Sequence, residues 1–478
     1  MTGTALRLGL DLGTSSLKAV VLDPSGAVVA TGSSSYATQA GADGRGAEQR
    51  PADWLRAAGQ AVAEIRATLG HAATAGIGGI GLAGQLPTLV ALGAAGPLPP
   101  AVTWLDDRAD GLARAVVEEA GGDALYRRTG MRIDGRYLAP MFRHHFGHRH
   151  GDVRGILSAK DYLCFALTGR SVTDPSTAAG YAVFGLEGGA WDDELVRLWQ
   201  LDPALLPEIA PSNAVAGPLH EAGSSLLGLP AGLPVSVGAA DSVASALAMG
   251  GLEEGTAVVT MGSSTVILDS VRRPVLDGAG RYILTPHAAE GWYGREMDLL
   301  ATGTGFDWLC RLFEIGPDRF AAEALAAPVG AAGVSFAPYL GGGEQGALWD
   351  PSLRGAVHGL ALRHRRGDIL RAFLEGVMFE IRRCLAVLGE AQAPRRVVVA
   401  GHLAASPGLL GMLADVLHLP VAPWPGASPA AVGAALNAPV AGAAAAAAAG
   451  ASAEPSEAAD AYEALYEAYL RRYPLAAR

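Results

Sequence analysis

The chain has little lysine, little cysteine and little charge. Among its 478 residues, lysine occurs only at positions 18 and 160, and charged residues make up 17%. The three cysteines, at positions 164, 310 and 384, are far apart and match no metal-ligand spacing, so we expect buried thiols in a reducing cytoplasm. The net charge of −11 argues against a nucleic-acid partner, because binding to a phosphate backbone needs clustered cations.

Long apolar runs are absent as well. The seven alanines at 443–449 are too few and too weakly apolar to span a bilayer, and no secretory signal precedes Asp11, so we expect no membrane partner. What the chain does have is length and apolar residues. Half of it (50%) is hydrophobic, which predicts a globular protein of two or three domains with a sizeable core.

The most informative motif lies near the N-terminus, where an acid, a turn of small residues and a lysine separate two apolar strands. A glycine permits the tight turn, and exposed N–H groups with Thr and Ser hydroxyls can wrap phosphate oxygens. An Asp at the strand end can hold Mg²⁺ through water. An ordinary hairpin is an equally good interpretation of one such loop. The residues predicted to bind phosphate here are Asp11, Gly13, Thr14, Ser15, Ser16 and Lys18.

A second copy of this motif lies about half a chain later. The apolar stretch 255–260 leads into a turn containing Gly262, Ser263 and Ser264, and a second apolar stretch follows at 266–268. Two such hairpins predict a duplicated fold that closes on one nucleotide from both sides.

Strands and helices alternate along the chain, which indicates an α/β architecture. We place the domain boundary near residue 245, with domains 1–245 and 246–478. The second domain carries an Ala-rich segment at 438–456, either a linker or a weak helix, and a C-terminal helix at 459–473. Other expected helices are 51–69, 158–167, 302–313 and 368–388, and other expected strands are 77–83, 234–238 and 396–400.

In their order along the chain, these motifs resemble the FGGY carbohydrate kinases of the actin-like ATPase superfamily, in particular the xylulokinase-like branch. Matching segments outside the hairpins are 84–85, 104–108, 160–163, 173–176, 238–242 and 338–340. The resemblance covers nearly the whole chain. It implies two actin-like (ribonuclease H-like) domains with a nucleotide and sugar cleft between them. It also implies Mg²⁺- and ATP-dependent phosphorylation of a sugar or sugar-alcohol hydroxyl, and it leaves a homodimer open.

Segment 238–242 is similar to the family's segment with the catalytic aspartate, and this resemblance makes Asp241 the predicted general base. Phosphoryl transfer needs a positioned acceptor, neutralised phosphates and a base, and Asp241 follows a strand end, where ligands bind in open α/β sheets. The alternative is that Asp241 only caps the helix that begins at Ser242. The predicted Mg²⁺ ligands are Asp11 and Asp241.

The resemblance supplies the remaining predicted site residues. On the nucleotide side they are Gly303, Gly401 and His402, besides the hairpin residues; on the sugar side they are Gln85, Leu86, Pro87, Trp104, Asp106, Arg108 and Asp241. Asp106 and Arg108 also fit a salt-bridged helix start. Glu344 and Gln345 lie in a Gly-rich loop that either closes over the cleft or has no role in the site.

The chain departs from the family pattern at three places, one of which is Pro429, where the family often has an acidic residue. Pro87 stands where xylulokinases usually carry a His that contacts the sugar, which argues against D-xylulose as the substrate. His402 and Leu403 replace glycines and are expected to crowd the nucleotide. A sensor protein of the same fold that has lost turnover is the alternative function, but such a protein would not need to retain both Asp11 and Asp241.

Overall fold

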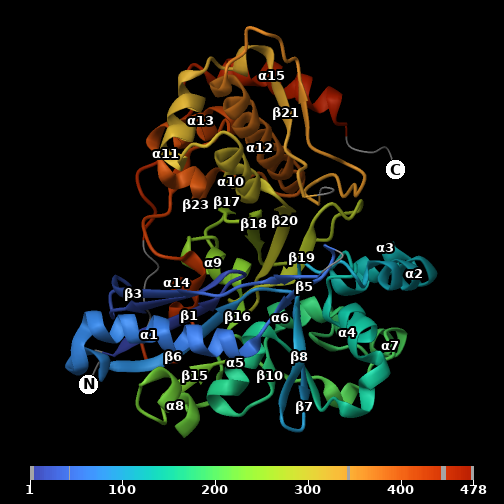
Figure 1. The fold of residues 1–478 in the computed structure, drawn as a ribbon, viewed down its shortest axis with the longest axis vertical. Coiled ribbons are helices and arrows are strands. Elements are labelled where there is room, and N and C mark those ends of the chain that lie inside the picture. Colours follow the sequence, from blue (N-terminus) through green and yellow to red (C-terminus); the bar gives the residue numbers. More distant parts are fainter. Residues whose placement is uncertain (1–4, 42–43, 342–344, 443–447, 475–478) are drawn as a thin grey trace.

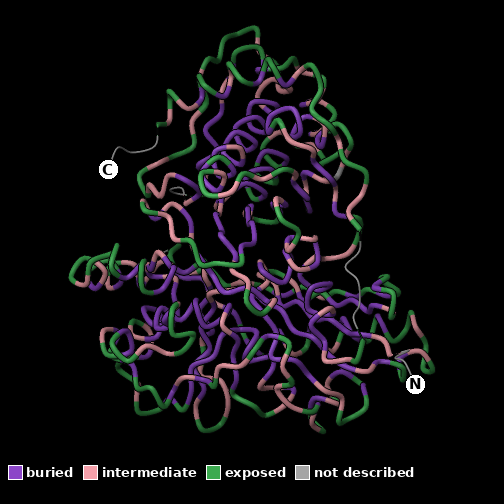
Figure 2. Tube along the Cα trace, turned by 180° about the vertical axis from the view of Figure 1, so that it is seen from behind, coloured by how far each residue is buried: buried purple, intermediate pink, exposed green. Residues whose placement is uncertain are grey.

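The chain folds into two lobes, each built on its own β-sheet (Figure 1). The computed structural model describes residues 5–41, 44–341, 345–442 and 448–474. Buried segments fill the inside of both lobes, and exposed segments form their outer surface (Figure 2). Within the described ranges, no helix is long and apolar enough to cross a membrane.

The sheet of the first lobe has the strand order β14-β15-β6-β1-β2-β3. Strands β1, β2 and β3 are antiparallel and joined by short turns, whereas β6 runs parallel to β1 after a crossover through helix α1. Helix α1 buries an apolar stripe that includes Trp54, Ala58 and Ile65, at the spacing of a helix that covers a sheet. The bounds are β1 Leu6–Leu12, β2 Ser16–Leu22, β3 Val28–Ser35, α1 Pro51–Thr74, β6 Ile77–Gly84, β14 Val215–Pro218, β15 Pro234–Ser236 and β16 Ala239–Ala240, which pairs with β6.

The sheet of the second lobe repeats this plan, with the order β19-β20-β18-β17-β23-β24. Strands β17, β18 and β20 are antiparallel, and β23 and β24 run parallel to β17. The repetition confirms the predicted duplicated α/β fold. The bounds are β17 Thr256–Met261, β18 Thr265–Val271, β19 Ile283–Pro286, β20 Tyr293–Leu299, α10 Thr302–Leu312, α11 Pro317–Ala326, α12 Arg366–Gly389, β23 Arg396–Gly401, α13 Pro407–Leu417, β24 Val421–Pro423 and α15 Ala459–Arg472.

Two short helices lie between the sheets: α9 (Asp241–Ala248) and α14 (Pro429–Leu436) (Figure 1). Although α14 comes late in the chain, it packs on β1, β6 and α9 of the first lobe. Side chains of both sheets and both helices share one apolar core, which includes Val20, Val258 and Ala431. The two lobes are therefore joined by buried contacts between the two sheets and the two helices.

A side layer of the first lobe carries part of the site. It combines a five-stranded sheet, β4-β5-β8-β7-β9, with helices around a separate core that includes Phe142 and Trp199. Helix α5 follows this sheet. Its N-cap residue Ser158 accepts a hydrogen bond from the N–H of Asp161 at 3.2 Å, and Gly169 ends it with a φ of 74°. The bounds are β4 Gln39–Ala40, β5 Ala47–Gln49, β7 Thr88–Gly93, β8 Gly96–Thr103, α2 Asp110–Ala120, α3 Gly122–Thr129, α4 Leu138–Phe146, β9 Gly155–Ser158, α5 Ala159–Thr168, α6 Pro175–Ala178, α7 Asp193–Leu198 and α8 Glu221–Leu227.

The predicted helices and strands are all present, with ends that differ by a few residues. In the Ala-rich segment 438–456, residues 443–447 lie outside the described residues, and the described part contains no helix. The C-terminal helix α15 packs on the second lobe through buried Tyr462, Tyr466 and Tyr469. The domain boundary near residue 245 stays a prediction.

Candidate active site

Two cavities meet at Asp241, between the lobes. The hairpin cavity is bounded by both hairpin turns, and its lining includes Asp11, Gly13, Thr14, Ser15, Ser16, Lys18, Gly262, Ser263, Ser264, His402 and Ser428. The interlobe cavity is bounded by residues of both lobes, and its lining includes Gln85, Leu86, Pro87, Trp104, Arg136, Glu296, Asp298 and Gln345. Thr14, Trp104, Asp241, Ser242 and Ser264 line both cavities.

The first hairpin turn is held by its carbonyl groups. Tyr36 donates its hydroxyl to the carbonyl of Gly13 and its N–H to that of Ser15, the latter at 3.0 Å. The side-chain amide of Gln49 donates to the carbonyl of Thr14 at 2.7 Å. The N–H of Gly13 is also bound, to the carbonyl of Ser16 at 3.1 Å. With these groups occupied, the backbone N–H groups of Thr14 and Ser15 and the nearby hydroxyls can face the cavity that these residues line. Such a turn suits an anion such as phosphate.

The second hairpin turn is held by helix α10 and strand β23. The N–H of Thr304, in the first turn of α10, donates to the carbonyl of Ser263 at 3.1 Å. A Cβ on Gly303 would lie 1.7 Å from the carbonyl oxygen of Gly262, and one on Gly401 (φ 87°) would lie 2.0 Å from that of Met261. The two glycines let the backbone approach the turn closely. Neither lines the cavity, so their predicted contact with a nucleotide stays a prediction.

Asp11 lies one residue before the end of β1, and one of its carboxylate oxygens has no hydrogen-bond partner in the described part of the chain. Oδ2 accepts a hydrogen bond from Ser428 at 3.1 Å, whereas buried Oδ1 has no partner among the residues that the structure describes. Burial raises the pKa of Asp11, while Lys18, directly opposite in the hairpin, and the Ser428 hydroxyl lower it. No group of three or more His, Cys, Asp or Glu in the described ranges could hold a metal ion. One or two carboxylates suit Mg²⁺, which keeps several waters and binds phosphates.

Asp241 is the first residue of α9. The N-cap of this helix is Ala240, so the alternative prediction that Asp241 is the cap is wrong. Burial raises the pKa of Asp241 to about 7, and the nearby charges of Asp11 and Asp298 also raise it. A carboxyl group with a pKa near neutrality is well placed to accept a proton in catalysis.

A buried hydrogen-bond network holds the segment before Asp241. The N–H of Ala240 donates to the hydroxyl of Ser176 at 3.0 Å, and both the N–H and the hydroxyl of Ser176 donate to Asp174. Lys160, fully buried, lies 3.1 Å from the same carboxylate. The sequence identified these residues only as segments that match the family. The structure connects them to the backbone next to Asp241.

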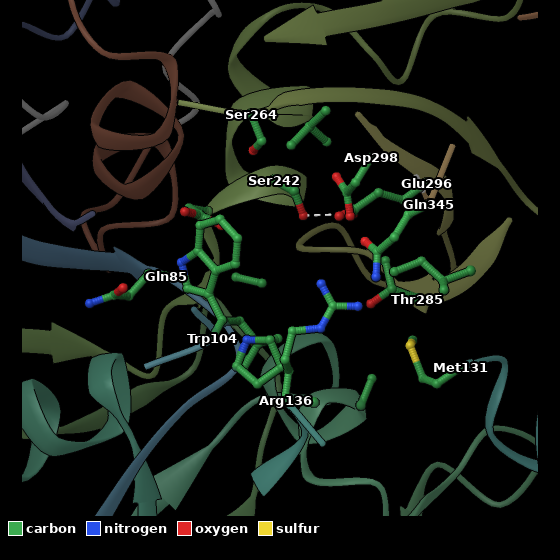
Figure 3. Close-up of a pocket in the computed structure, with 18 of the residues that line it drawn as sticks. Gln85, Trp104, Met131, Arg136, Ser242, Ser264, Thr285, Glu296, Asp298 and Gln345 are labelled. Atoms are coloured by element: carbon green, nitrogen blue, oxygen red, sulfur yellow. Dashed lines mark hydrogen bonds between the residues drawn. The ribbon is translucent and has the colours of Figure 1, made fainter. Parts of the chain in front are cut away.

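The interlobe cavity brings polar groups of both lobes together (Figure 3). Gln85 is buried, and its Oε1 has no hydrogen-bond partner in the described part of the chain. The indole of Trp104 donates to the hydroxyl of Thr14 at 3.1 Å, at the junction of the two cavities. Leu86 and Pro87 contribute apolar surface. The cavity therefore offers several hydrogen-bonding groups to a small polar ligand.

The sequence did not predict three charged residues of this cavity: Arg136, Glu296 and Asp298. The two acids lie two residues apart on β20, so both face the cavity. Ser242 donates to Glu296 at 2.7 Å. Burial raises the pKa of Glu296 well above its usual value, and burial raises that of Asp298 to about 6 although Arg136 lowers it. Two acids at this spacing in one strand, on the face opposite Arg295, were the signal in the sequence.

Asp106 and Arg108, predicted to bind sugar, line neither cavity. Asp106 is buried and accepts hydrogen bonds from Arg108 and from the N–H of Ala47, while Arg108 also pairs with Glu48 at 2.6 Å. These contacts favour the alternative of a structural salt bridge.

The structure also tests two predictions about the loops. Leu403 is buried in the core of the second lobe, so the expectation that it crowds a nucleotide is wrong. His402 does line the hairpin cavity, and the centroid of its ring lies 5.1 Å from the ring centroid of Phe306. Glu344 lies outside the described residues. Gln345 lines the interlobe cavity, and its amide oxygen, when turned toward Arg136, accepts from Nη1 at 2.9 Å.

Known proteins share both the sequence pattern and the fold. The N-terminal domain of the FGGY family of carbohydrate kinases matches residues 6–248, and the C-terminal domain of that family matches 257–442. A xylulose kinase of Streptomyces coelicolor is 31% identical over 81% of this chain and 77% of its own length. A gluconokinase of Bacillus subtilis is 28% identical over 87% of this chain and 83% of its own length. The crystal structure of xylulose kinase from Rhodospirillum rubrum superposes with a TM-score of 0.84 at 29% identity, covering 98% of both chains.

These matches span both lobes and both hairpins. They confirm the predicted resemblance and the two-domain actin-like fold. The chain therefore belongs to the FGGY family of carbohydrate kinases, enzymes that use ATP as phosphate donor.

Proposed function

We propose that this kinase transfers the γ-phosphate of ATP to a hydroxyl of a sugar or polyol bound in the interlobe cavity, with Asp241 as general base. The observation that carries the proposal is the position of Asp241 on the walls of both cavities. One cavity is bounded by two turns suited to phosphate, and the other by groups suited to hydroxyls. Phosphoryl transfer needs donor and acceptor to meet in this way beside a base.

In the proposed reaction, the acceptor hydroxyl loses its proton to the Asp241 carboxylate as its oxygen bonds to the γ-phosphorus. The bond from that phosphorus to the leaving oxygen of ADP breaks, which gives ADP and a phosphorylated sugar. The N–H and hydroxyl groups of Thr14 and Ser263 would hold the phosphates. Closure of the two lobes around bound substrates would exclude water, which favours transfer to the sugar over hydrolysis of ATP.

Mg²⁺ fits the uncommitted oxygen of Asp11. When bound, the ion neutralises phosphate charge. Asp11 would hold it through a coordinated water, and Asp241 is the second candidate ligand. A cytoplasmic location is part of the proposal, because Cys164, Cys310 and Cys384 are buried thiols.

D-xylulose is not expected to be the best acceptor. Pro87 lines the interlobe cavity and has no side-chain donor or acceptor, so it cannot make the hydrogen bond that a His would make. A lost hydrogen bond of this kind costs about 1–3 kcal/mol. A panel of ketoses, polyols and sugar acids, compared by kcat/KM, tests this expectation. A clear lead of D-xylulose over every other acceptor would contradict it.

A coupled assay of ADP release across that panel tests the proposed function itself. We expect ADP formation that depends on the acceptor and is lost in Asp241→Asn. A protein that binds ATP tightly but forms no ADP with any acceptor would instead support the alternative of a sensor that has lost turnover.

A further inference from the structure

The lining of the interlobe cavity is predominantly acidic. Among the described residues, its ionisable acids are Asp241, Glu296 and Asp298, and Arg136 is its basic residue. Arg136 reaches the cavity, where the amide oxygen of Gln345, turned toward it, accepts from its Nη1, but it is also held by Asp134, to which its Nε donates at 3.0 Å and its Nη2 donates as well. Arg136 and Asp134 together are close to neutral, so the three acids that line the cavity outnumber the positive charge left to balance them.

Strand β20 also takes part in a buried ion pair with a structural role, which serves as a comparison. Arg295, on the opposite face of β20, is fully buried and binds Asp269 through two nitrogens, with Nε at 2.8 Å. Glu296 and Asp298 face the other way, into the cavity, and within the described ranges neither is bound by an Arg through two nitrogens. A buried carboxylate without such a partner is costly for the fold, which favours a role toward a ligand.

The interlobe cavity offers several hydrogen-bond acceptors. Gln85 Oε1 is buried without a partner among the residues that the structure describes, and the carboxylates of Glu296 and Asp298 are acceptors when ionised. Such groups need donors from the ligand, and sugar hydroxyls are donors. A carboxylate on the ligand would bring a further acceptor and a like charge, which is strongly unfavourable in a buried site.

We propose that Glu296 and Asp298 select the acceptor by charge, so that the interlobe cavity takes neutral polyhydroxy compounds and rejects sugar acids. This inference rests on the proposed function only in taking the interlobe cavity as the acceptor site. It assigns the choice between sugar classes to two residues of the second lobe.

The test is a charge series on one carbon skeleton. D-Gluconate is negative, D-glucitol is neutral and 1-amino-1-deoxy-D-glucitol is positive, and D-xylonate, xylitol and 1-amino-1-deoxy-D-xylitol repeat the series with five carbons. Dissociation constants are measured by calorimetry on the full chain with a non-hydrolysable ATP analogue and Mg²⁺. We expect the acid to bind roughly 10-fold or more weakly than its neutral counterpart, and the amine to bind at least as well as the neutral compound.

Asp298→Asn and Glu296→Gln each remove one ionisable carboxyl group from the cavity and keep the side-chain size. Both are expected to reduce the ratio of acid to neutral dissociation constants several-fold. Glu290→Gln is the matched control, since it removes an acid from the exposed turn just before β20 and should leave the ratio unchanged. A melting curve for each variant shows whether it is folded. If only one of the two cavity variants folds, that one suffices to test the change in the ratio.

Three results would overturn the proposal: a sugar acid that binds as well as its neutral counterpart, a ratio that neither cavity variant changes, or no binding of any compound. Failure of the proposed function has a different outcome. Binding that follows the charge order without any phosphorylation would retain charge selection and remove the kinase reaction from this cavity. Preferred phosphorylation of a sugar acid would retain the kinase reaction and exclude charge selection.

Discussion

Replacing Asp241 by Asn is expected to lower turnover and raise stability at the same time. The amide keeps the size of the carboxyl group but cannot accept the proton of the acceptor hydroxyl. Loss of a general base typically costs roughly 10²–10⁴-fold in rate. The KM for ATP should change little, because the hairpin turns rather than Asp241 are proposed to hold the phosphates.

The gain in stability follows from the pKa of Asp241, which the folded protein raises from 3.8 to about 7. An acid whose pKa is raised by folding destabilises the folded state above its unfolded pKa. This cost grows as the pH rises from about 4 to about 7 and is constant above that. A rise of about three units corresponds to at most about 4 kcal/mol, and to less where water in the cavity reaches the carboxylate. Near pH 5 the cost is only about 1.5 kcal/mol. Asn removes it.

Thermal unfolding and steady-state kinetics of both proteins between pH 5 and pH 8 provide the test. The melting temperature of Asp241→Asn should exceed that of the wild type by a margin that grows up to about pH 7. Asp53→Asn is the control, since Asp53 also lies in the first turn of a helix but faces solvent, 3.6 Å from Arg56. It should show neither effect. Turnover of Asp241→Asn within a few-fold of the wild type would refute the assignment of the base, and an equal melting temperature at pH 8 would refute the reasoning about its buried charge.

Three further predictions concern the same site. Asp11→Ala should lower kcat and raise the Mg²⁺ concentration needed for half-maximal rate, and an unchanged Mg²⁺ titration would make Asp11 structural. The kcat of the wild type should fall as the pH drops below about 7, because Asp241 then holds a proton and cannot accept another, whereas a flat pH–rate profile would exclude it as the base. Ser176→Ala should lower kcat about 10-fold and leave the KM for ATP unchanged, since the N–H of Ala240 loses its buried acceptor. Ser212→Ala removes the other hydroxyl that binds the same carboxylate and should leave kcat unchanged, and equal losses in both variants would indicate a purely structural network.

Local patterns in the sequence predicted the hairpins and most of the elements. A strand, a small-residue turn and a second strand need only neighbouring residues, so the turns after Asp11 and Met261 were identifiable in advance. The ends of α5 were also predictable, because Ser158 and Gly169 satisfy backbone groups of their own helix. The resemblance to a family indicated Asp241, and the structure then placed it on the walls of both cavities.

The sequence was less informative where a side chain's partners are far away in the chain. Asp106 and Arg108 fitted either a sugar-binding pair or a salt-bridged helix start, and Glu48, from another strand, completes a salt-bridge network with them. Leu403 looked like an obstacle to the nucleotide, but the turn after β23 directs it into the core.

What the sequence by itself determined is the repeated α/β plan, the two phosphate-type turns and the Asp11 that precedes the first of them, because each depends on residues close together in the chain. Only the tertiary structure decided what faces the acceptor. Arg136 comes from the side layer of the first lobe, and Glu296 and Asp298 come from a strand of the second. They meet because α9 and α14 join the two sheets through a shared apolar core, and packing of this kind is non-local and leaves no motif in the sequence.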